Sequence, residues 1–198
     1  MLLQNKNHLV KLLIGFRIGL SAVILSVFNK NCRQIDIVNN FNLQIQFSIR
    51  YLYTVLFFFK KHSILLFNIL TDITCLEILD SKLKYLIIYS VLNIQNNLRI
   101  FLKIKTNENN NILSITSLFS TANWMEREIF DFFGLFFLFN KDLRRLLLDY
   151  GFKGYPLRKN FPLSGFIEVI YNDTIKKITY PKVNITQEYR LFFYQKTN

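Results

Sequence analysis

The chain has 198 residues, of which 51% are hydrophobic and 19% charged, so it can form a packed domain and is too apolar to be disordered. Its two cysteines and two histidines are too few for a disulfide framework, a structural zinc site or an iron–sulfur cluster, so any redox chemistry near this protein is expected to be carried by another molecule. The net charge of +12 favours an acidic partner or nucleic acid.

The first predicted element is a strongly apolar helix over residues 4–28. Within it, residues 9–28 match the thickness of a bilayer, but Lys11 and Arg17 lie inside this stretch and are costly in a membrane. We therefore expect the helix to pack on a sheet or on a neighbouring subunit. A membrane anchor is the alternative.

The next stretch contains alternating strand and helix patterns. A helix is predicted over residues 50–61, where Lys60 and Lys61 suit the negative end of the helix dipole. This order of elements predicts an α+β fold over residues 1–138, with helices in one layer and a mixed sheet in the other. Strands are predicted, with polar turns between them, over residues 35–38, 43–47, 65–79, 83–92 and 98–105.

A short helix is predicted over residues 124–133. Asn123 and Glu126 form a capping-box pattern at its start, in which the side chains satisfy free backbone amides. Gly134 is a suitable residue to end the helix.

The charges of this helix invite two interpretations. Arg127 and Asp131 stand one helical turn apart, so we expect them to pair on the surface. Catalytic use of the carboxylates Glu126, Glu128 and Asp131 is the alternative, but no histidine or ligand cluster accompanies them.

Residues 151–165 hold three of the six glycines and two of the three prolines, which excludes a regular helix or strand. Aromatic and basic side chains alternate there, so we expect an extended, Gly/Pro-rich arm over residues 139–198 that packs on a partner subunit. Arg144 and Arg145 should add to the same basic face. A loop folded back on its own domain is one alternative. An RNA-binding GXXG loop at residues 151–154 is another, and the following prolines disfavour its helix.

Beyond this loop, a short hairpin is predicted from strands over residues 166–171 and 176–180. The turn Asn172-Asp173 joins them, and a polar tail follows.

The C-terminal half resembles a known family. The run ANWMEREIFDFFG at residues 122–134 resembles a signature of the NuoC-type, 30 kDa peripheral-arm subunit of respiratory complex I, called NADH dehydrogenase subunit 9 in mitochondria. Asn140-Lys141 stands where the family usually has His-Pro, and Asn160 where it has Asp. Further blocks match in order and spacing at residues 142–145, 149–154, 156–159, 161–165, 168–171 and 187–190.

The resemblance implies a non-redox scaffold subunit of proton-translocating NADH:ubiquinone oxidoreductase, on the matrix side of the mitochondrial inner membrane. It implies an arm packed along the quinone-cavity, 49 kDa-type subunit and other peripheral-arm subunits, with FMN, iron–sulfur clusters and ubiquinone carried by partner subunits. No catalytic, cofactor-binding or metal residue, no nucleic acid, and membrane contact only through the complex are expected. Codon bias, with 21 Phe and two Ala, indicates mitochondrial encoding. The alternatives are a basic mitochondrial ribosomal protein and a membrane-anchored respiratory subunit.

The residues expected to bind partners or to support this part of the fold lie in the matched blocks. They are Trp124, Glu126, Arg127, Asp131, Gly134, Arg144, Arg145, Asp149, Tyr150, Gly151, Phe152, Gly154, Pro156, Arg158, Lys159, Phe161, Pro162, Gly165, Gln187 and Arg190.

Overall fold

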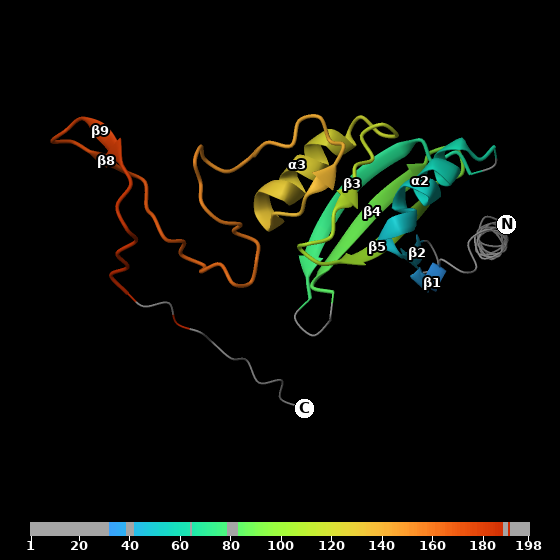
Figure 1. The fold of residues 1–198 in the computed structure, drawn as a ribbon, viewed down its shortest axis with the longest axis horizontal. Coiled ribbons are helices and arrows are strands. Elements are labelled where there is room, and N and C mark those ends of the chain that lie inside the picture. The colour runs from blue at the N-terminus through green and yellow to red at the C-terminus, as the bar shows by residue number, and fades with distance from the viewer. Residues whose placement is uncertain (1–31, 39–41, 64, 79–82, 188–189, 191–198) are drawn as a thin grey trace, which may run out of the picture. The chain divides into compact units, whose positions relative to one another are not determined.

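The computed structural model describes most of the chain after residue 31 (Figure 1). The chain divides into two compact units, with the boundary in the sequence between Tyr155 and Pro156. The predicted helix at residues 4–28 lies outside the described residues, as do residues 39–40 of the polar turn predicted between the strands at residues 35–38 and 43–47. None of the helices in the described part has the length and apolar character needed to cross a bilayer. The structure describes residues 32–38, 42–63, 65–78, 83–187 and 190.

The first unit is built on a five-stranded mixed sheet with the order β1-β2-β5-β4-β3 (Figure 1). Strands β2 and β5 are parallel, and the other neighbouring pairs are antiparallel. All five predicted strands are present, with bounds that differ by a few residues. The strands are β1 (Cys32–Val38), β2 (Asn42–Phe47), β3 (Ile69–Glu77), β4 (Tyr85–Asn93) and β5 (Leu98–Thr106).

One face of this sheet carries the core. On β5, alternate residues from Leu98 to Thr106 are buried, as the two-residue period of a strand with one covered face requires. The buried side chains of helices α2 (Leu52–Lys61) and α3 (Ala122–Phe133) belong to the same apolar cluster as these strand residues. Both helices therefore lie on one face, which confirms the predicted two-layer α+β fold.

A second, two-stranded sheet frames helix α3. Strand β6 (Ile112–Leu113) precedes the helix and pairs in parallel with β7 (Phe137–Leu138), which follows it. The Ser114 amide also donates to the Leu138 carbonyl at 2.9 Å. The sequence does not predict this sheet, because two residues per strand show no periodicity.

The second unit contains a small hairpin of β8 (Ile170–Asn172) and β9 (Lys177–Thr179), extended by a bridge between Ile167 and Lys182. This hairpin is predicted, although its strands are shorter than expected. The rings of Phe161 and Phe166 meet edge to face, with 5.2 Å between centroids. Between residues 156 and 187 the described backbone contains no helix.

Candidate functional site: the buried charges of helix α3

Helix α3 ends as predicted and begins differently. Gly134 takes the left-handed conformation, with φ of 71°, and its amide donates to the Phe130 carbonyl at 2.9 Å. The helix starts after Thr121, and no side chain caps it, so the predicted capping box of Asn123 and Glu126 is wrong. The reason is that the Glu126 carboxylate bonds to groups outside the helix.

Glu126 joins helix α3 to the segments on both sides of it in the sequence. Its carboxylate is fully buried and accepts from the Ser114 hydroxyl at 2.7 Å, the Ile115 amide at 2.8 Å and the Asn140 side-chain amide at 2.9 Å. Burial raises the pKa of Glu126 above its ordinary value, and these three hydrogen bonds offset part of the rise. The Glu126 carboxylate thus links helix α3 to the segment that follows β6 and to the segment that follows β7.

Asp131, five residues after Glu126 on helix α3, is also a buried carboxylate with hydrogen-bond donors from another segment. One carboxylate oxygen accepts from three successive amides, those of Leu146 at 3.1 Å, Leu147 at 2.8 Å and Leu148 at 2.9 Å. The other oxygen accepts from the Arg145 guanidinium at 3.0 Å. Burial by itself would raise the pKa of Asp131, but these hydrogen bonds outweigh it and hold the pKa below its ordinary value. Asp131 therefore stabilises a segment that has no strand or helix partners of its own.

Arg127 is also buried, and the predicted surface pair of Arg127 with Asp131 is wrong. The Arg127 guanidinium donates to the backbone carbonyls of Arg144 at 3.1 Å and Arg145 at 3.3 Å. It also lies 5.1 Å from the centre of the Trp124 ring. The Arg127 guanidinium and the Asp131 carboxylate therefore both bind backbone groups of the irregular segment after β7. Those backbone groups have no strand or helix partners, so they need partners from side chains.

The two neighbouring arginines have different environments, so they do not form the single basic face that the sequence predicts. Arg144 is exposed and pairs with Asp142 at 3.0 Å. The side chain of Arg145 is 26% exposed; besides Asp131, it donates to the Gly154 carbonyl at 3.0 Å. Its guanidinium lies 5.9 Å from the centre of the Phe152 ring and 5.1 Å from that of Tyr155. Residues 152–155 thus fold back onto their own unit, which was the alternative interpretation for this part of the loop.

The remaining predicted residues lie in turns or in the second unit. Asp149 accepts from the Tyr150 amide at 2.8 Å through its side chain, while Gly151 and Gly154 have positive φ. Tyr150 is fully exposed. Gln187 and Arg190 are exposed near the end of the described chain. The second unit also holds Pro156, Arg158, Lys159, Phe161, Pro162 and Gly165.

Sequence reasoning missed two sets of residues around this network. Ser114 and Asn140 bind Glu126, and they lie in irregular segments where no periodic pattern identifies a buried polar group. The second set consists of large apolar residues that are exposed: Phe136, Phe139 and Leu147. Trp124, one of the candidate site residues predicted from the sequence, is exposed as well. Apolar residues in a segment without secondary structure are the signal that could have identified them.

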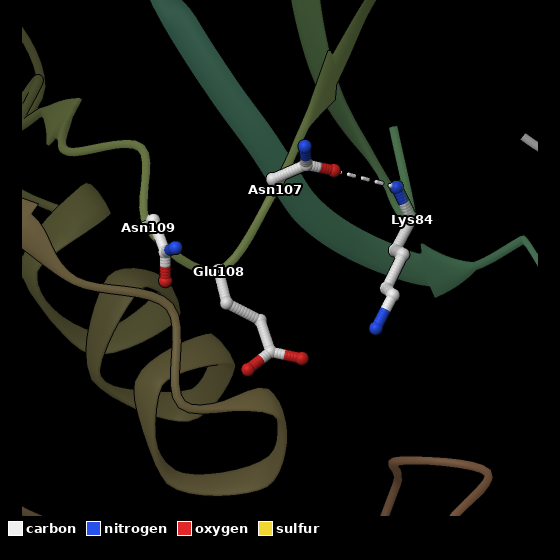
Figure 2. A pocket seen from close by; sticks show the side chains of 4 residues that line it. All are labelled: Lys84, Asn107, Glu108 and Asn109. Carbon is white, nitrogen blue, oxygen red and sulfur yellow. Dashed lines mark hydrogen bonds between the residues drawn. The ribbon is translucent and has the colours of Figure 1, made fainter. Parts of the chain in front are cut away.

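Other features of the described residues lie outside the α3 network. A hollow lined by Lys84, Asn107, Glu108 and Asn109 carries charges of both signs. The Asn107 side chain accepts from the Lys84 amide at 3.0 Å there (Figure 2). No group of three or more His, Cys, Asp or Glu side chains in the described part of the chain is placed to hold a metal ion. Burial raises the pKa of Cys75 to about 12, so its thiol stays protonated. The hydrogen bonds of the buried charges of α3 organise the fold around that helix.

Comparison with known proteins identifies the family. The profile of the 30 kDa subunit of respiratory-chain NADH dehydrogenase matches residues 45–167. NADH dehydrogenase (ubiquinone) iron-sulfur protein 3 of Beta trigyna is 43% identical over 142 residues, which cover 72% of this chain and 74% of the relative. NADH-ubiquinone oxidoreductase subunit 9 of Acanthamoeba castellanii is 36% identical over 190 residues, covering 96% and 92% of the two chains.

A solved structure agrees in fold. The trypsin-resistant fragment of Nqo5 superposes with a TM-score of 0.54 at 23% identity, covering 63% of this chain and 98% of the fragment. Neither alternative interpretation, a ribosomal protein or a membrane-anchored subunit, gains support from these matches. The chain therefore belongs to the 30 kDa subunit family of respiratory-chain NADH dehydrogenase, complex I, as its sequence blocks predicted.

Proposed function

We propose that this complex I subunit is a non-redox scaffold, which supports electron transfer from NADH to ubiquinone without a catalytic residue of its own. The buried carboxylates Glu126 and Asp131 support this proposal, because their oxygens are occupied by backbone and side-chain donors of the same unit. A general acid or base must instead reach a substrate proton.

The names of the plant relatives include the words iron-sulfur protein, yet the residues of this chain do not fit a cluster of its own. Clusters are held by thiolates, commonly four. This sequence has two cysteines, and burial of Cys75 disfavours its thiolate. FMN, iron–sulfur clusters and ubiquinone then belong to partner subunits. Stoichiometric iron in the purified chain would contradict this.

The partner-binding part of the proposal is carried by the hairpin of the second unit. Tyr171 and Ile178 face each other across the two strands and are 56% and 59% exposed, while Ile170, on the opposite face, is 46% exposed. A three-residue strand pair cannot cover apolar side chains on both of its faces. We infer that the second unit packs as an arm on partner subunits, chiefly the quinone-cavity, 49 kDa-type subunit. The first part of the expected arm, residues 139–155, belongs to the first unit.

The family and the composition support a location for this protein. We propose that the protein works on the matrix side of the mitochondrial inner membrane, that it reaches the membrane only through the complex, and that it binds no nucleic acid. The bias towards residues with AT-rich codons supports encoding in the mitochondrial genome.

The hairpin can be tested with a double variant, Tyr171→Ser with Ile178→Ser. Truncating an anchor at an interface often costs about 2 kcal/mol or more, so the two changes should lower recovery in the full-size complex at least tenfold. Ile94→Ser is the matched control, because Ile94 is an exposed apolar residue in a turn of the first unit. Recovery is measured on native gels, and circular dichroism of the isolated chain checks folding. Normal assembly of a folded double variant would refute hairpin docking.

A further inference from the structure

The sheet face opposite helices α2 and α3 carries a row of cations beside a row of apolar residues. Side chains that point to this face alternate with core side chains along each strand. The antiparallel register places Lys105 beside Leu86 and Lys103 beside Ile88. We call the following set the open sheet face: Leu76, Leu86, Ile88, Arg99, Lys103 and Lys105.

The cations of the open sheet face lack acidic partners among the described residues. No ion pair joins Arg99, Lys103 or Lys105 to a described carboxylate, and the Lys103 ammonium donates to the neutral side chain of Gln44. Asp72 lies on the same face, and its carboxylate accepts from the next amide in the chain at 2.8 Å. On strands β2 to β5 the face therefore carries three cations and one aspartate, and the register pairs Asp36 of β1 with Gln44.

The apolar residues of this face are incompletely covered. Leu86 and Ile88 are half-buried, and Leu76, the neighbour of Leu86 on the edge strand β3, is 53% exposed. Contiguous exposed apolar residues bordered by charge are typical of interaction sites. A partner for this face must offer apolar side chains opposite β3 and β4 and carboxylates opposite β5.

We propose that the open sheet face binds an acidic, partly apolar segment of another complex I subunit. Arg99 and Lys105 are six residues apart on one strand and so span about 20 Å, the length of a helix of about 13 residues. This proposal rests on membership of the family and is independent of the proposed hairpin docking.

Two other occupants fit the chemistry less well. Residues 1–31 contain lysines and an arginine but no aspartate or glutamate, so their charge repels this face. Single-stranded RNA is bound on open sheets by exposed aromatic rings, whereas the aromatic side chain here, Phe101, is half-buried.

The first test is zero-length carbodiimide cross-linking of the intact complex, followed by mass spectrometry. We expect Lys103 or Lys105 to be joined to an aspartate or glutamate of another subunit, and both amines to be protected from acetylation in the complex. Cross-links only within this chain, or acetylation as fast in the complex as in the isolated chain, would overturn the proposal.

The second test reverses the charge. Lys103→Glu with Lys105→Glu should lower incorporation into the complex at least tenfold, whereas the double change to Arg should preserve it. Lys61→Glu is the control, because Lys61 is exposed at the end of α2 on the other layer. Normal incorporation of a folded double Glu variant would refute the proposal, as would nuclease-sensitive retention of the chain on RNA. If that variant fails to fold, the cross-linking result decides.

Discussion

Replacing Asp131 with Asn is the sharpest perturbation of the α3 network, because it removes one charge and keeps the shape. The Asp131 side chain is fully buried, and its partner Arg145 keeps 26% of its side chain exposed. Removing one member of a buried pair costs about 3–5 kcal/mol, and water that reaches Arg145 places this case at the lower end. The Asn carbonyl can still accept from the amides of Leu146–Leu148, whereas its NH2 group faces Arg145. We therefore expect a loss of about 3 kcal/mol in the free energy of unfolding.

Urea unfolding followed by fluorescence measures this loss, because Trp124 is the single tryptophan and lies next to the network. Asp173→Asn is the matched control. Asp173 is 87% exposed and pairs with the exposed Lys176 in the second unit, so its loss should cost less than about 1 kcal/mol. The lowered pKa of Asp131 adds a second readout. The contribution of the Asp131 carboxylate to the free energy of unfolding is complete above the pKa of Asp in the unfolded chain, near 3.8. It is lost as the pH falls through the pKa of the folded chain, so only the wild type should show this loss of stability. Equal stabilities of the two variants would refute the network as the source of stability.

Three further changes test other parts of the structure. The wild type should lose stability as the pH rises from about 4.5, because the raised pKa of Glu126 means that the native state holds a proton that the unfolded chain has lost. Glu126→Gln should abolish this pH dependence. An unchanged pH profile of the free energy of unfolding would contradict the burial assigned to this carboxylate. In a Cys32→Ser background, Cys75 should resist iodoacetamide at pH 8 until the chain unfolds, as mass spectrometry can show, and rapid native labelling would mean that Cys75 is accessible. Gly134→Ala should lower the urea midpoint by an amount equivalent to about 1 kcal/mol, since Ala disfavours the left-handed conformation, and no change would argue against that helix end.

The sheet could be predicted from the sequence because its strands are long enough to show a period of two. Residues 43–47 and 98–105 alternate between core and open face, and each strand is bounded by polar turns. Strands β6 and β7 contain two residues each, and their pairing joins positions 112 and 137 across helix α3. Nothing local in the sequence encodes that contact, so it could not be predicted.

The importance of residues 122–134 could be predicted, but the roles of their charges could not. Spacing on a helix identifies which side chains share a face, and Arg127 and Asp131 do stand one turn apart. Their actual partners are backbone groups of residues 144–148, which become neighbours only after the chain turns back past β7. A surface pair and a buried network have the same sequence pattern, so the long-range fold decides between them.

The buried charges of α3 therefore account for how an irregular segment holds one conformation. Residues 140–148 contain no helix or strand, and their backbone groups need partners when they approach a core. Asp131 satisfies three amides and Arg127 two carbonyls, while Glu126 holds the side chain of Asn140 at the start of the segment. Apolar side chains at these positions would bury more surface but leave those backbone groups unsatisfied. Charge on helix α3 is thus a structural requirement of the segment that leads from the first unit towards the second.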